Sequence, residues 1–333
     1  SGNEGSPIKT AMRAMAELGA RLGKDARIAY SCSTGYGENL LESAFNLDVG
    51  EVETIAHCTA ASFFDPQVDC VLDIGGQDMK CIKLKGGVVE NVLLNEACSS
   101  GCGSFIENFA NSLGFTAKDF AKEALFARHP VDLGTRCTVF MNSNVKQAQK
   151  DGAHVTDISA GLSISVVKNA LYKVIRCSGA HELGSHIVVQ GGTFLNDAVL
   201  RAFEQELGRN VTRPTISGIM GAFGAALAAR DLHLEQSALL SFSALQSFSH
   251  SAKPITCNGC TAHCGLTVIT FADGHKFISG NRCEKGAGKQ DISNDLPDLY
   301  EYKLNRLFGY KEVFEKDAKR GHVAIPRVLN MYE

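Results

Sequence analysis

The sequence of 333 residues has little that would direct it to a nucleic acid, a membrane or the secretory pathway. Its formal net charge is only -3, which gives no basic excess for binding nucleic acid or anionic lipid. No apolar run approaches the roughly 20 residues that a membrane-spanning helix needs, and no signal peptide is visible. We therefore expect a globular protein of a reducing, cytoplasmic compartment.

The two commonest phosphate-binding fingerprints are absent as well. Neither the Walker pattern G-x-x-x-x-G-K-[ST] nor the dinucleotide pattern G-x-G-x-x-G occurs in the chain. This argues against an ordinary P-loop NTPase and against an ordinary NAD-binding domain. A nucleotide site in this protein would have to be built from other turns.

Cysteine, by contrast, is plentiful, with 12 in the chain. In a long chain without a secretion signal, so many thiols indicate metal or redox chemistry more than a disulfide framework. Cys98 and Cys137 each stand just before a predicted helix, whose free N–H groups stabilise a thiolate or an anionic cluster. Buried cysteines are often inert core residues. An iron–sulfur cluster usually needs four thiolates, however, so two per chain predict a cluster shared between two copies.

A first glycine pair lies in Asp73-Ile74-Gly75-Gly76-Gln77-Asp78, at a turn of a predicted three-stranded meander over residues 68–94. Glycines let backbone N–H groups approach phosphate oxygens without a Cβ clash. Asp73 and Asp78 are candidates for holding Mg²⁺, directly or through water, and Gln77 for orienting a water molecule. The alternative is a tight hairpin with capping aspartates.

A second pair, Gly191-Gly192, follows a predicted strand and opens a helix, with Asn196 as its N-cap or as a nucleotide contact. The alternative is an ordinary strand-to-helix turn. Nearer the N-terminus, residues 27–31 are predicted to form a short strand, followed by a turn that contains Thr34-Gly35. The two glycine pairs, Gly75-Gly76 and Gly191-Gly192, together predict a nucleotide held between two lobes.

Four further cysteines form a module near the end of the chain: Cys257, Cys260, Cys264 and Cys283. Their C-x2-C-x3-C spacing, with the fourth after a predicted hairpin, is specific for a metal site. Either zinc with four thiolates or a second iron–sulfur cluster fits the pattern. The sequence does not choose between them.

Together, in this order, the motifs over residues 27–230 resemble the activator (archerase) of 2-hydroxyacyl-CoA dehydratases and the related ATPase subunits of benzoyl-CoA reductase. The matching segments are Thr34-Gly35, Glu53–His57, Asp73–Lys80, Asn95–Phe105 with Cys98, Cys137–Phe140, Gly191-Gly192 with Asn196, and Gly221–Ala226. The resemblance implies an α/β protein of the acetate and sugar kinase/Hsc70/actin fold, with two ribonuclease-H-like lobes.

The resemblance also implies a function. ATP or ADP with Mg²⁺ would lie between the lobes, against Thr34, Gly35, Gly221 and the two glycine pairs. A homodimer, or a second activase domain of the same parent chain, would share one [4Fe–4S] cluster through Cys98 and Cys137. Hydrolysis would drive an electron, supplied by reduced ferredoxin or flavodoxin, onto an iron–sulfur dehydratase or reductase partner.

Departures from the family pattern suggest the domain organisation. The family's first phosphate loop is expected before residue 7 and is missing, so we expect a fragment of a longer multidomain protein. Residues 1–232 would be the activase-like domain, 233–253 a linker or packing arm, 254–289 the cysteine module and 290–333 the start of a further region. The rival hypothesis is a degenerate nucleotide-binding scaffold with structural zinc. A small-molecule kinase is less favoured, because it has no need of the paired thiolates.

Overall fold

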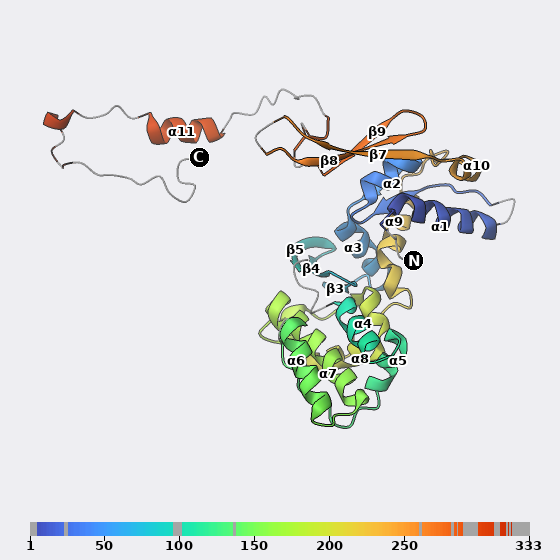
Figure 1. Ribbon diagram of the computed structural model, residues 1–333, viewed down its shortest axis with the longest axis vertical. Helices are drawn as coiled ribbons and strands as arrows, with labels where there is room; N and C mark the ends of the chain where they lie inside the picture. Colours follow the sequence, from blue (N-terminus) through green and yellow to red (C-terminus); the bar gives the residue numbers. More distant parts are fainter. Residues whose placement is uncertain are drawn as a thin grey trace. The chain divides into compact units, whose positions relative to one another are not determined.

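The computed structural model describes residues 5–22, 26–95, 102–135, 138–259, 262–280, 283–284, 286–288, 299–309, 314–317, 319 and 321. Three predicted metal ligands, Cys98, Cys137 and Cys260, lie outside these residues. The chain divides into two compact units, Ser1–Phe248 and Ser249–Glu333. Each unit is described by itself below (Figure 1).

A four-stranded sheet of order β5-β4-β3-β6 lies at the centre of the first unit. Its strands are β3 (Cys70–Ile74), β4 (Met79–Lys85), β5 (Val88–Asn95) and β6 (Ile187–Gln190). The first three form the predicted antiparallel meander, and β6 runs parallel to β3. Strand β3 is buried at every position because helices cover both of its faces, and its apolar composition suits that place. The expected α/β class is therefore confirmed.

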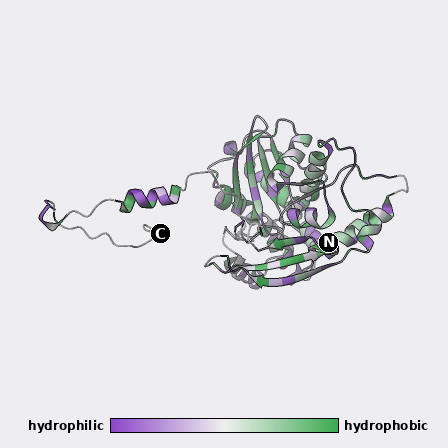
Figure 2. Cartoon of the chain, turned by 90° about the horizontal axis from the view of Figure 1, so that it is seen from above, coloured by the Kyte–Doolittle hydropathy of each residue, from purple (hydrophilic) through white to green (hydrophobic). Residues whose placement is uncertain are grey.

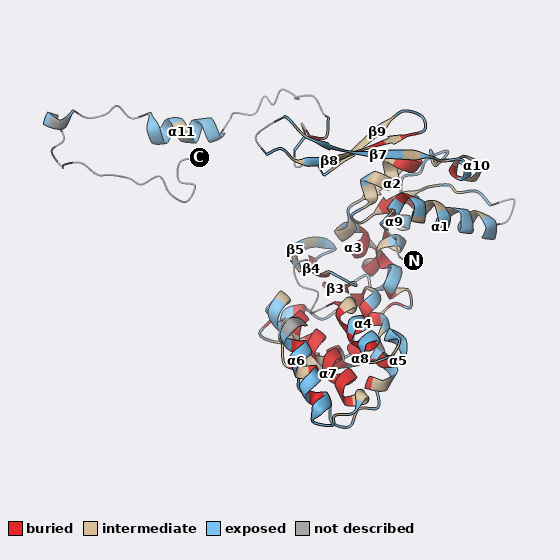
Figure 3. Ribbon diagram, in the orientation of Figure 1, coloured by how far each residue is buried: buried red, intermediate tan, exposed pale blue. Residues whose placement is uncertain are grey.

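Two groups of helices enclose this sheet, on opposite faces (Figures 1 and 3). Helices α3 (Glu53–Phe64) and α9 (Met220–Arg230) pack on the face that carries Val71, Ile82 and Val188. Leu72, Ile74 and Cys81 face the opposite way, into a larger core. The helices of that core are α4 (Gly103–Ser112), α5 (Ala117–Ala124), α6 (Thr138–Lys150), α7 (Val155–Lys168) and α8 (Asp197–Leu207). Period-2 alternation along β3, β4 and β6 thus separates two apolar layers. Figure 2 shows green, hydrophobic strand segments among the helices.

One helical stretch, Val155–Ile175, is long and apolar enough to cross a membrane. It consists of α7 and the π-helical segment Asn169–Ile175 that continues it. Within its most apolar window, 72% of the residues are buried inside the protein. This stretch is therefore a core helix of the larger layer.

Four elements precede α3 in the first unit: α1 (Pro7–Arg21), α2 (Glu38–Phe45), β1 (Cys32–Thr34) and β2 (Val49–Glu51), with β1 parallel to β2. The strand predicted over residues 27–31 is therefore misplaced. Asp48 explains the difference, because its carboxylate accepts hydrogen bonds from the backbone N–H and the hydroxyl of Ser31, each at 2.7 Å. Ladder pairing begins only at Cys32, which faces Val49.

The chain after α9 returns to this part of the unit. Ser237 donates a hydrogen bond to Asp48 at 2.7 Å, and Leu240 N–H donates to the Phe45 carbonyl at 3.0 Å. Helix α10 (Phe242–Gln246) packs against α1, and the Phe248 ring meets that of Phe45 edge-on at 5.3 Å. Residues 237–248 thus behave as an arm of the first unit.

The second unit contains a three-stranded antiparallel sheet. Its strands are β7 (His250–Thr256), β8 (Gly265–Phe271) and β9 (Lys276–Ser279), in the order β7-β8-β9. The predicted hairpin corresponds to β8 and β9, and Gly274 at its turn has φ +89°. Helix α11 (Leu299–Phe308) follows, with none of its residues buried.

We expect Gly224→Ala to destabilise the first unit by about 1–3 kcal/mol, because a Cβ at this position of α9 would overlap the Ala56 carbonyl of α3. Thermal or urea unfolding measures the loss. Gly37→Ala is the matched control, since a Cβ there meets nothing within 4 Å. Equal stability of the two variants would contradict the close α3–α9 packing.

Candidate functional site

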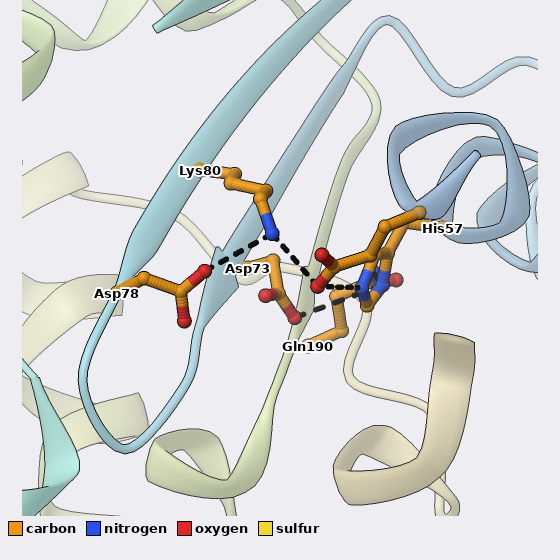
Figure 4. Close-up of polar contacts among 6 residues, drawn as sticks. His57, Asp73, Asp78, Lys80 and Gln190 are labelled. Carbon is orange, nitrogen blue, oxygen red and sulfur yellow. Dashed lines mark hydrogen bonds and ion pairs between the residues drawn. The ribbon is translucent and has the colours of Figure 1, made fainter. Parts of the chain in front are cut away.

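Three polar side chains stand in a row across the central sheet. Asp73 on β3 pairs directly with Lys80 on β4 and with Gln190 on β6. Directly opposed residues share a face of the sheet, so all three point toward α3 (Figure 4). They are nearly inaccessible, with exposed fractions of 4%, 5% and 0%. Such deep burial of polar groups requires partners, and α3 supplies them.

Glu53 and His57 lie one turn apart in the first half of α3 and meet this row. Lys80 Nζ lies 2.7 Å from Glu53 Oε1 and 3.0 Å from Asp78 Oδ2. His57 Nε2 lies 3.4 Å from Glu53 Oε1, while Nδ1 contacts the Gln190 amide and lies 3.8 Å from Asp73 Oδ1. The five residues labelled in Figure 4 therefore converge from one helix, three strands and the turn between β3 and β4.

The charges of this network shift the pKa values of its members. The hydrogen bond with His57, together with Lys80, lowers the pKa of Glu53 to about 2. Burial would lower the pKa of Lys80, but the hydrogen bonds and charges of Glu53 and Asp78 outweigh it and raise that pKa. Burial raises the pKa of Asp73, although His57 and Lys80 oppose the rise. Lys80 is thus held as an ammonium between two carboxylates.

Several buried oxygens near the row accept no hydrogen bond from any described residue. They are Asp73 Oδ1, Gln190 Oε1 and Thr34 Oγ1. Gly221 of α9 lies beside them, since a Cβ there would stand 3.4 Å from the His57 ring and 3.7 Å from the Thr34 side chain. Buried oxygens without donors are costly in a native protein unless a ligand or water satisfies them. They are also the atoms that Mg²⁺ and its bound water prefer.

The first glycine turn joins the sheet to α4. Gly103 N–H donates to the Gly75 carbonyl at 3.0 Å, and Ser104 N–H donates to the Gly76 carbonyl at 2.9 Å. The hydroxyl of Thr193 also donates to the Gly75 carbonyl, at 2.8 Å. The two glycine turns and the first residues of α4 therefore form one hydrogen-bonded junction, which we call the Gly75 junction.

At the second glycine turn, Gly191 has φ +92°, and a Cβ would collide with the Ile74 carbonyl. Only glycine fits there. Asn196 is the N-cap of α8, because its Oδ1 accepts from Ala198 N–H at 2.9 Å and Val199 N–H at 3.2 Å. Asn196 is therefore an N-cap, and it also lines the cavity described next.

A cavity of about 260 Å³ opens beside the Gly75 junction. Gly103 of α4 and Gly192 of the second turn form part of its wall. Apolar walls come from Ile106, Leu125 and Leu195, and charged side chains of both signs also line the cavity: Lys118, Lys122, Glu107 and Asp197. An apolar cavity with a few polar and charged groups suits a heterocycle with polar edges.

The structure brings some predicted residues together and leaves others apart. Asp73, Gly75, Gly76, Gly191, Thr34 and Gly221 gather around the row. Gln77 lies exposed in the first turn, between Gly76 and Asp78. The carboxylate of Asp78 points at Lys80, and its Oδ1 lies 2.7 Å from where a Cβ of Gly75 would be.

Sequence reasoning did not assign roles to Glu53, His57, Lys80 and Gln190. The i,i+4 spacing of Glu53 and His57 is a local signal, and a lysine inside an apolar strand is another. Among the described residues, no group of three or more His, Cys, Asp or Glu side chains is placed to hold a metal ion. The proposed ligands Cys98, Cys137 and Cys260 lie outside that set.

A sequence model described as the BadF/BadG/BcrA/BcrD ATPase family matches residues 2–229. The chain belongs to this family. It is 34% identical over 204 residues to the (R)-2-hydroxyglutaryl-CoA dehydratase activating ATPase of Acidaminococcus fermentans, covering 61% of this chain and 76% of that protein. It is 28% identical to a benzoyl-CoA reductase subunit of Thauera aromatica, over 66% of this chain and 78% of the relative.

Solved structures agree with the family assignment. Component A of the Acidaminococcus fermentans dehydratase matches with a TM-score of 0.60 at 32% identity, over 66% of this chain and 83% of that one. The activator of the 2-hydroxyisocaproyl-CoA dehydratase from Clostridium difficile, with bound ADPNP, matches with a TM-score of 0.59 at 28% identity, over 70% of this chain and 84% of that one. The α/β fold of the first unit is therefore that of the dehydratase activators.

We expect Glu53→Gln to alter how stability depends on pH. The folded-state pKa of Glu53 is about 2, below its ordinary 4.5, so this carboxylate stabilises the fold above about pH 4.5. That contribution is lost as the pH falls toward 2. The stability difference between wild type and Glu53→Gln should therefore shrink over this range in urea unfolding. Glu90→Gln, on an exposed position of β5, is the control. A pH-independent difference would contradict the network.

Proposed function

We propose that this protein is an ATPase-coupled electron-transfer activase. It binds ATP with Mg²⁺ at the row of Asp73, Lys80 and Gln190, and hydrolysis drives low-potential electron transfer from a shared [4Fe–4S] cluster. The acceptor is an iron–sulfur enzyme of the 2-hydroxyacyl-CoA dehydratase type or a related reductase, and the donor is reduced ferredoxin or flavodoxin. Family membership and the named activities of the relatives support this assignment.

The Gly75 junction is the observation that carries the proposal. The turn that approaches the phosphates and the helix that follows the Cys98 segment share hydrogen bonds through the carbonyls of Gly75 and Gly76. Thr193 ties the second glycine turn to the same carbonyl. A displacement of either turn by the nucleotide would therefore be passed directly to the start of α4.

Each residue of the row has a different proposed role at the phosphates. Asp73 Oδ1 and Gln190 Oε1 are the oxygens offered to Mg²⁺ and its water shell. Lys80 adds positive charge close by, and Glu53 and Asp78 hold it in place. Asp78 is thus better assigned to positioning Lys80 than to binding the metal. Bound Mg²⁺ would neutralise charge on the phosphates while water adds to the terminal phosphorus and ADP leaves.

His57 holds the row together from the side of α3. Its ring lies between Glu53, Gln190 and Asp73, and Gly221 of α9 leaves room for it. The side chain of Gln190 is thereby fixed with its amide nitrogen toward His57, which leaves its oxygen available. His57 is a positioning residue in this scheme.

The cavity beside the junction is the proposed site for the nucleotide base. Ile106, Leu125 and Leu195 would contact the ring, and its polar groups would meet the charged side chains of Lys118, Lys122, Glu107 and Asp197. Gly103 belongs both to this wall and to the Gly75 junction. Base and phosphate contacts therefore meet at the same turn.

The cluster assignment rests on two helices of one core. Helix α4 begins five residues after Cys98, and α6 begins immediately after Cys137. Phe105 and Ile106 of α4 share the larger core with Met141 and Val145 of α6. Two thiolates per domain are half of the usual ligand set, so a second activase domain must supply the others. A bound cluster would supply one-electron transfer.

Asp73→Asn should lower the kcat of ATP hydrolysis at least about 100-fold, because the amide removes a charge offered to the metal. Malachite-green phosphate release measures the rate, and a fluorescent ADPNP analogue measures binding separately. Asp231→Asn, at an exposed surface position, is the control, and Gln77→Ala tests the water-orienting role. ADPNP binding without any wild-type hydrolysis would instead favour a nucleotide-binding scaffold.

Thr193→Val should weaken communication between the nucleotide and the cluster, because it removes the hydroxyl donor to Gly75 with little change of shape. In anaerobically reconstituted protein, iron-chelation rates with an ATP analogue and with ADP report this communication. The ratio of the chelation rate with the ATP analogue to the rate with ADP should move toward one. The change should be up to about tenfold, because one hydrogen bond is lost. Thr193→Ser should restore it. A wild-type protein that binds no iron would overturn the cluster assignment.

A further inference from the structure

The cysteines of the second unit leave its sheet at one end. Cys257 directly follows the last residue of β7, and Cys264 directly precedes the first residue of β8. Strand β9 runs back toward the same end, and Cys283 follows it four residues later. Three cysteines, each next to the end of a different strand, thus lie at the same end of the sheet.

Two of these thiols occupy directly opposed positions. Thr256 pairs with Gly265, and one step further Cys257 N–H donates to the Cys264 carbonyl at 2.8 Å. Directly opposed residues of antiparallel strands carry side chains on the same face, with Cα atoms about 4.5–5.5 Å apart. Thiolates around one zinc ion at about 2.3 Å lie about 3.8 Å from each other in a tetrahedron. Opposed cysteines can therefore share a single ion.

The backbone after Cys257 bends back over its sulfur. Gly259 N–H donates to Cys257 Sγ at 3.5 Å. A hydrogen bond from the backbone stabilises the thiolate form of a cysteine, and such bonds are typical of sulfurs that ligate a metal. The next cysteine in the chain, Cys260, completes the C-x2-C spacing.

The other side of this edge is also closely packed. Gly280, just after β9, has φ +82°, and a Cβ there would stand 2.6 Å from the Gly265 carbonyl. The chain therefore remains against the start of β8 as it turns toward Cys283. Only a glycine permits so close an approach in this conformation.

The sheet has little else to hold it together. Among the described residues of this unit, the buried hydrophobic side chains are Leu266, Ile269 and Phe271, all on β8. Strand β7 is exposed from Ser251 to Thr256. A core of this size contributes too little to offset the entropy of ordering such a unit, and natural domains of this kind are held by a metal or by disulfides.

We propose that Cys257, Cys260, Cys264 and Cys283 bind one structural Zn²⁺ that closes this end of the sheet. Four thiols lose their protons and form four sulfur–zinc bonds, so no oxidant or reductant takes part. The opposed pair favours a single ion over a [4Fe–4S] cluster, in which each thiolate binds a different iron. Among the described residues Cys257, Cys264 and Cys283 are not yet grouped as ligands, so zinc binding would bring their side chains together at this end of the sheet. The inference is independent of the proposed activase function.

The test measures zinc, iron and sulfide per chain in the whole protein, purified anaerobically from medium containing both metals. Wild type and Cys98→Ala/Cys137→Ala should each retain about one zinc ion. Cys264→Ser should lose it, while Cys32→Ser, a partly buried cysteine of β1, should not. Two results would overturn the proposal: iron and sulfide that are present in wild type but lost in Cys264→Ser, or a wild-type protein without zinc.

Cobalt substitution tests the site without depending on the yield of folded variants. Co²⁺ added to metal-free wild type should give the intense visible bands and the sulfur-to-cobalt charge-transfer band of a tetrahedral thiolate site. Zn²⁺ should displace the cobalt and abolish these bands. Weak octahedral bands without charge transfer would contradict a four-thiolate site.

Discussion

The site depends on the register of three strands. Asp73 lies opposite both Lys80 and Gln190, so a lysine, a carboxylate and an amide are forced into adjacent buried positions. A shift of one residue in either pairing would turn Asp73 toward the larger apolar core. The cost of burying these groups is offset in part by α3, whose Glu53 and His57 satisfy Lys80 and the amide nitrogen of Gln190. Asp73 Oδ1 and Gln190 Oε1 remain without a donor among the described residues. These unpaired oxygens reduce the stability of the fold at the place where a ligand would bind.

Glycine makes the approach of the separate elements possible. At Gly191 the backbone runs against the Ile74 carbonyl, and at Gly103 a Cβ would stand 2.7 Å from the Thr193 hydroxyl. At Gly224 the helices α3 and α9 touch through the Ala56 carbonyl. Each contact lets two elements of the first unit approach closely. Glycine at these positions therefore lets the elements that carry the charged side chains come close to one another.

Local patterns predicted the meander over residues 68–94, the two glycine turns and the hairpin of the second unit, because alternation and turn residues are written into short segments. The partners of Asp73 were not predictable in this way. Gln190 lies more than a hundred residues away in the chain, and only strand pairing brings it to Asp73. Gln77 is exposed in the first turn, so its predicted role in orienting a water molecule stays a prediction. The cysteine positions and the family resemblance supplied the cluster hypothesis, which falls on Cys98 and Cys137, outside the described part of the chain.

The Gly75 carbonyl has two lone pairs, and Gly103 and Thr193 occupy both. A water molecule cannot enter this contact without displacing one of them, so intermediate positions of the turn would leave a polar group unpaired. Motion at this point is thereby restricted to a small number of fully bonded arrangements. The start of α4 would therefore shift relative to the two glycine turns in discrete steps and not by continuous sliding.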